Sequence, residues 1–175
     1  MMLWISFLSV TGLTGGIVHL FNHGVMKGAL FLAVGCVVLR TGSANLDDFR
    51  GLGKRMPITM TAFVLAGLSL IGVPLTVGFV SKWYLVLGGM AAGEWWVVSL
   101  LLASSLLTAT YFFRLLEKIY ARPTPDSSSI EEVPLALRFP ILILGLAVVF
   151  FGLSNTRILD LFLRGALPPG MVMPG

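Results

Sequence analysis

Long apolar stretches, separated by a few short polar loops, dominate the pattern of hydrophobic and polar positions along the chain. The stretches are continuous over about 16 residues or more, which is typical of transmembrane helices and not of the alternating strands of a membrane barrel. We therefore expect an all-α membrane protein with about five transmembrane helices, over residues 13–39, 57–73, 75–90, 95–119 and 137–163. An earlier apolar segment, Leu3–Val10, is too short to cross a bilayer.

The second and third expected helices are short and lie next to each other. Each corresponds to about 25 Å of helix, below the ~30 Å of a hydrocarbon core, whereas one fused helix would exceed about 50 Å. The chain is therefore expected to turn or break near Gly72 and Pro74, with Gly78 as a second weak point. Short membrane segments interrupted by glycine and proline point to the ion site of a transporter.

The apolar helices are expected to form a single membrane domain over residues 1–165, followed by a disordered tail at 166–175. Polar, proline-containing segments between the helices are expected to be loops. If the five helices cross the bilayer in alternation, the basic residues divide about six against four between its two sides. That division does not decide the orientation of the chain.

Composition narrows the class of protein. Hydrophobic residues make up 57% of the chain and charged residues 11%, with a mean hydropathy of +0.94, whereas a soluble domain has about 25% charged residues. The net charge is +4, but the basic residues lie mostly at the ends of apolar segments, where membrane orientation explains them better than nucleic-acid binding. The chain has no nucleophile, phosphate-loop or redox-cofactor motif. We therefore expect neither a chemical enzyme by itself nor a cofactor.

Four titratable residues inside apolar segments are the candidates for function. His19, His23 and Lys27 are four residues apart, so each lies about 400° and ~6 Å further along a helix and all three share one face. Lys82 lies just after the expected break. Titratable side chains at membrane depth are costly and usually mark an ion or proton path. Imidazoles relay protons near neutral pH, and a lysine can switch its protonation state.

Other interpretations of the same residues stay open. Lys82 lies about seven residues into a short helix, so its long side chain is able to reach the interface. His19 and His23 are also compatible with hydrogen bonds between helices, or with metal or haem ligation, although Lys27 one turn away disfavours a metal. Two polar neighbours offer further hydrogen-bonding groups to a relay: Asn22 and Ser81.

Three stretches of the chain together resemble a known family: HLFNHGVMKGALFLAVG, a loop ending in GLGKRMP, and LSLIGVPLTVGFVSKWYL. They are similar to the antiporter-like subunits of respiratory complex I and of Mrp-type Na+/H+ antiporters, most of all the Mrp D subunit. The resemblance extends from about Gly12 to Leu163. It implies a fold of about fourteen transmembrane helices with two inverted repeats, each containing a broken helix.

The resemblance also implies roles for the candidate residues. Lys82 corresponds to the key ionisable residue of the second broken helix, and Lys27, His23 and His19 correspond to polar residues that lead to it. The implied function is proton translocation through a half-channel of a multisubunit cation/H+ antiporter or complex I-like assembly. The implied partners are other subunits, the lipid bilayer, H+ and Na+, and the implied location is the bacterial cell (inner) membrane.

The similar region covers only about the last five helices of this fold. We therefore expect a fragment of a longer subunit, rather than one half of a split subunit. At most, the chain would act as a proton-pumping subunit of an NADH:quinone oxidoreductase-like complex. The alternative hypothesis is a structural membrane module, or an inactive fragment, that seals partner subunits.

Overall fold

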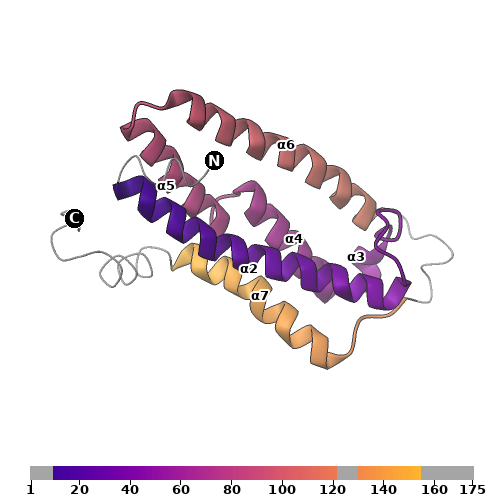
Figure 1. Cartoon of the computed structure of the whole chain (residues 1–175). Helices are drawn as coiled ribbons and strands as arrows, with labels where there is room; N and C mark the ends of the chain where they lie inside the picture. The colour runs from indigo at the N-terminus through magenta and orange to yellow at the C-terminus, as the bar shows by residue number, and fades with distance from the viewer. Residues whose placement is uncertain (1–9, 122–129, 155–175) are drawn as a thin grey trace.

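The computed structural model describes residues 10–121 and 130–154, and every regular element within these ranges is a helix. The expected segment at Leu3–Val10 lies almost wholly outside the described residues, as do the end of the last expected helix and the tail. The helices are α2 (Val10–Thr41), α3 (Leu52–Arg55), α4 (Pro57–Ile71), α5 (Val77–Ala91), α6 (Trp95–Tyr120) and α7 (Leu135–Leu153) (Figure 1). The prediction of an all-α membrane protein is confirmed.

Two short helices in series replace one long helix in the middle of the bundle. Three segments are long and apolar enough to cross a membrane, namely Gly16–Thr41, α6 and α7, whereas α4 and α5 have 15 residues each. In Figure 1, α4 begins beside α3 and α5 ends at the opposite end of the bundle. The predicted break is therefore present between Ile71 and Val77, and α4 and α5 together make one interrupted passage. Gly78 does not interrupt the chain again, because it is the second residue of α5.

The polar segments that follow α2 and α6 lie at the same end of the bundle. Lys118 binds Asp47 at 2.7 Å, and the N–H of Gly51 donates to the carbonyl of Lys118 at 3.1 Å. The hydrogen bond and charge of the Lys118 ammonium lower the pKa of the exposed Asp47 carboxyl. The expectation that these segments lie on opposite sides is wrong, because the broken helix crosses once and not twice.

The corrected topology gathers the basic residues at one end. In the described ranges, seven of the nine lysines and arginines lie in the segments that meet there or in the adjoining helix turns: Arg40, Arg50, Lys54, Arg55, Arg114, Lys118 and Arg138. The other two are Lys27 and Lys82, which lie inside α2 and α5. The described part of the bundle is therefore strongly asymmetric in positive charge.

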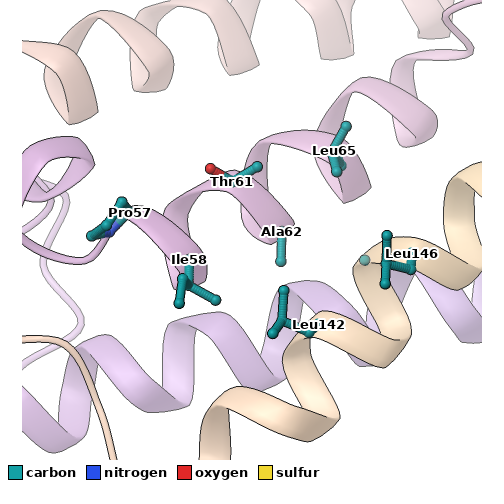
Figure 2. Close-up of a pocket in the computed structure, with 8 residues that line it drawn as sticks. Pro57, Ile58, Thr61, Ala62, Leu65, Leu142 and Leu146 are labelled. Atoms are coloured by element: carbon teal, nitrogen blue, oxygen red, sulfur yellow. The ribbon is translucent and has the colours of Figure 1, made fainter.

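Both halves of the broken helix pack against α2, α6 and α7. On α7, Gly145 packs against Ala62 of α4. An apolar groove of about 280 Å³ lies between these two helices. In Figure 2, Ile58 and Leu142 lie at one end of the groove and Leu65 and Leu146 at the other. The outer faces of α6 and α7 expose large apolar side chains, as expected for helices that meet lipid or another membrane protein.

Candidate functional site

The end of α4 is a glycine-terminated helix end in the middle of the bundle. Gly72 has a φ of 97°, and its N–H donates to the carbonyl of Ser69 while the N–H of Val73 donates to Leu68. This pattern is the Schellman motif, and it satisfies two of the four carbonyls that a helix end leaves free. The carbonyls of Leu70 and Ile71 remain to be satisfied.

Lys82 supplies the missing partner. Its Nζ donates to the carbonyls of Leu70 and Ile71, both at 2.9 Å. A third bond, at 2.7 Å, joins Nζ to the Oγ of Ser105 on α6. The ammonium thus lies at the negative end of the α4 dipole, where a cation is favoured. The side chain is half-buried and remains beside the break.

This site accommodates Lys82 in either protonation state. A charged ammonium has three N–H donors, and three acceptors are present. A neutral amine has two donors and one lone pair, so it can keep both carbonyl bonds and accept the hydroxyl proton of Ser105, because a hydroxyl rotates between donor and acceptor roles. No polar atom of this cluster then loses its partner, which lowers the cost of changing the charge.

The start of α5 is held by polar side chains from two other helices. The N–H of Gly78 donates to Ser69 Oγ of α4 at 3.0 Å, and Ser69 contacts the Sδ of Met26 at 3.0 Å. Asn22 of α2 donates to the carbonyl of Val77 at 3.1 Å. A Cβ on Gly78 would overlap the backbone carbonyl of Ser69, so only glycine fits this crossing of α4 and α5.

The two histidines of α2 approach the same region. His19 Nδ1 lies 2.9 Å from Ser81 Oγ, the residue before Lys82, and Ser81 also donates to the carbonyl of Gly78. The rings of His19 and His23 are 5.6 Å apart between centroids. The polar groups therefore continue from the start of α5 along one face of α2.

Lys27 lies one turn further along α2. Its Nζ is 5.6 Å from the centroid of the Phe31 ring, a cation–π distance, and the side chain is half-buried. The structure thus brings His19, His23 and Lys82 around the break and places Lys27 beyond them. Within the described ranges, no three histidine, cysteine or carboxylate side chains gather as a possible metal site.

Two residues of this site were not among the expected ones, Ser69 and Ser105. Both are serines inside strongly apolar helices. Serine hydroxyls in membrane helices form hydrogen bonds to neighbouring helices, so a serine within an apolar segment is the signal that the sequence offers. Which helix each serine faces does not follow from the sequence, because Ser105 and Lys82 are 23 residues apart.

Comparison with known proteins identifies similar chains. A family model described as "NADH:quinone oxidoreductase/Mrp antiporter, TM" matches residues 1–108. The N subunit of the NADH-quinone oxidoreductase of Desulforudis audaxviator is 45% identical, over 91% of this chain and 34% of its own length. The D subunit of a Na(+)/H(+) antiporter of Bacillus subtilis is 33% identical, over 81% of this chain and 29% of its own length.

Solved structures agree with these relatives. A chain of the Mrp complex from Dietzia sp. superimposes with a TM-score of 0.80 and 26% identity, over 87% of this chain and 37% of that one. A chain of the membrane-bound sulfane sulfur reductase, an archaeal respiratory membrane complex, gives a TM-score of 0.78 and 31% identity, over 89% and 31%. The chain spans about a third of the length of the relatives it matches.

Proposed function

The chain belongs to the NADH:quinone oxidoreductase/Mrp antiporter transmembrane family, as its sequence predicts, and we propose that it supplies a proton-binding lysine of a membrane half-channel. The observation that carries this proposal is the environment of Lys82. Its three partners are compatible with a charged and with a neutral side chain, as required of a group that binds and releases a proton during transport. Lys82 is the central proton acceptor in this proposal.

The route to Lys82 follows α2. Ser81 and His19 are in direct contact beside it, and His23 lies one turn away. Imidazole nitrogens accept and donate protons near neutral pH. Water fills the steps that side chains do not bridge, including the step from His23 to Lys27. His19, His23 and Lys27 form the relay, and Lys82 is its terminus within this chain.

The proposed partners are other subunits of a multisubunit membrane complex. The broken helix and its relay enclose only part of a proton path, so other segments must complete it. The relatives are about three times as long as this chain. Na+ is the proposed counter-ion, by analogy with the named activity of the Bacillus subtilis relative. The coupling is electrostatic, since a charge change on a neighbouring subunit alters the protonation of Lys82.

The proposed location is a bacterial cell membrane, with the α3 end of the bundle in the cytoplasm. This orientation follows from the gathering of basic residues at that end, because short cytoplasmic loops are enriched in lysine and arginine. In a Cys36→Ala background, Ala44→Cys should react with an impermeant maleimide only after the cells are permeabilised. Ala91→Cys, at the opposite end, should react in intact cells, and the reverse pattern would contradict this orientation.

The function is tested by replacing the central acceptor in the assembled complex. Lys82→Ala should reduce proton transport, followed by a pH-sensitive dye in inverted vesicles, to the rate of vesicles without the complex. The amount of assembled complex should stay near wild type, since Ser105 and the two carbonyls of α4 become accessible to water. Normal exchange by this variant would exclude Lys82 as the central group and would favour a structural module.

A further inference from the structure

Glu132, in the segment before α7, binds the start of α4. Its Oε2 accepts from the N–H of Ile58 at 2.9 Å and from the N–H of Thr59 at 3.4 Å. Its Oε1 accepts from the hydroxyl of Thr59 at 2.6 Å. Glu132 therefore caps a helix that begins more than 70 residues earlier in the chain.

The cap is needed because α4 has none of its own. Met56 precedes the helix and has no side-chain oxygen to offer, and Pro57 is its first residue. The first N–H groups of a helix have no partners within it, and they form its positive end. A carboxylate accepts hydrogen bonds from these N–H groups and places a negative charge at the positive end of the helix, and Glu132 supplies this carboxylate.

Glu132 is itself held in place from two directions. Arg40, at the end of α2, donates to its backbone carbonyl at 2.6 Å. The next residue, Val133, is fully buried in the main apolar core of the bundle. The Nε of Arg138 donates to the carbonyl of Val133. The carboxylate is thus presented to α4 by a segment anchored to both α2 and α7.

The two ends of α4 are therefore bound by opposite charges from outside the helix. Glu132 holds the first turn, and Lys82 holds the last two carbonyls, about 22 Å away along a helix of 15 residues. A helix of this length transmits a displacement of one end to the other, because its backbone hydrogen bonds make it stiff. The position of the Leu70 and Ile71 carbonyls then depends on how the first turn is held.

We infer that Glu132 is a positioning residue for Lys82 and acts through α4. This inference rests on the proposed role of Lys82 in transport only for its functional consequence. The structural part of the inference, that the geometry of the Lys82 site depends on Glu132, does not depend on a role in transport.

The chain offers a matched control, Glu131. It has the same charge and lies next to Glu132, but its side chain is exposed. Glu132→Ala removes the cap, whereas Glu132→Gln keeps a carbonyl oxygen for the Ile58 N–H and an amide that can donate to the Thr59 hydroxyl. The three variants Glu132→Ala, Glu132→Gln and Glu131→Ala separate loss of the cap from loss of a surface charge.

The first readout is proton transport per assembled complex. Glu132→Ala should lower it about fivefold, the order of a lost helix cap, while Glu132→Gln stays within about twofold of wild type. Glu131→Ala should have no effect. A purely structural cap would reduce the amount of assembled complex and leave the rate per complex unchanged, and this result would overturn the inference.

The second readout does not depend on transport. The background carries Cys36→Ala and Lys82→Cys, and the measured quantity is the rate at which a small water-soluble reagent alkylates the thiol at position 82. Adding Glu132→Ala should change this rate at least about threefold, an effect of the size expected for loss of a helix cap. The addition of Glu131→Ala should leave the rate unchanged. Equal rates in the two backgrounds would overturn the positioning role. Should Lys82→Ala itself transport normally, the proposed function fails, and the alkylation rate still decides the role of Glu132.

Discussion

The two ends of α4 satisfy the same physical need in different ways. At the start, a carboxylate from the segment before α7 accepts from free N–H groups. At the end, an ammonium from α5 donates to free carbonyls in the middle of the bundle. Each charge complements the helix dipole at its end.

The ends differ in where the charged partner lies. Glu132 lies in the segment before α7 and accepts from two N–H groups and from the Thr59 hydroxyl. Lys82 lies beside the break, between the last two carbonyls of α4 and the Ser105 hydroxyl of α6. One end of the helix is therefore held by a carboxylate from a loop, whereas the other is held by a lysine beside the break, in the middle of the bundle.

The largest expected effect comes from a change at the crossing of α4 and α5. Gly78→Ala places a Cβ against the carbonyl of Ser69, a backbone atom that cannot move without shifting α4. We expect a loss of about 3 kcal/mol of stability, because overpacking against backbone is not relieved by a rotamer change. The measurement is the midpoint of thermal aggregation of the complex in detergent.

Gly35→Ala on α2 is the matched control, since no atom lies within 4 Å of its added Cβ. It should leave the midpoint unchanged. If both variants were equally stable, the close contact between the two halves of the broken helix would be refuted.

A smaller effect is expected from the loss of the hydroxyl partner of Lys82. Ser105→Ala removes the third hydrogen bond of Lys82 but leaves both carbonyl bonds in place. We expect transport per complex to fall about tenfold, because a hydrogen bond to a charged group contributes on the order of 1.5–3 kcal/mol. Assembly should be unaffected, as judged by the yield of the purified complex.

Ser104→Ala provides the comparison for this variant. Ser104 is the preceding residue on α6, and it is exposed. Equal transport by the two serine variants would mean that the hydroxyl of Ser105 contributes nothing to the titration of Lys82. The end of α4 would then depend on the two carbonyl bonds of Lys82 alone.

Several features could be predicted from the sequence because they depend on local spacing. The i, i+4 repeat placed His19 and His23 on one helix face, and their rings are in contact. Two apolar segments too short to cross the bilayer predicted the break, and Gly72 ends α4 with a positive φ. These features follow from helix geometry and from glycine and proline chemistry.

The rest depends on contacts between distant segments. The sequence predicts an ordinary loop around Glu132, because nothing in its local sequence indicates a contact with Thr59, 73 residues away. Five alternating crossings predict the wrong sides for the loops, because α4 and α5 in series make one crossing, and the Asp47–Lys118 pair joins the two loops at one end. Whether His19, His23, Lys27 and Lys82 carry protons remains a prediction.

Transport by Lys82→Arg in the assembled complex tests whether the residue at this position must release a proton. A guanidinium can donate to the carbonyls of Leu70 and Ile71 and keeps the positive charge at the end of α4, but it does not release its proton at any physiological pH. We predict normal assembly with proton transport at background, while the exposed Lys54→Arg control transports at the wild-type rate. Wild-type transport by Lys82→Arg would contradict this prediction, because a fixed charge at this position would then suffice.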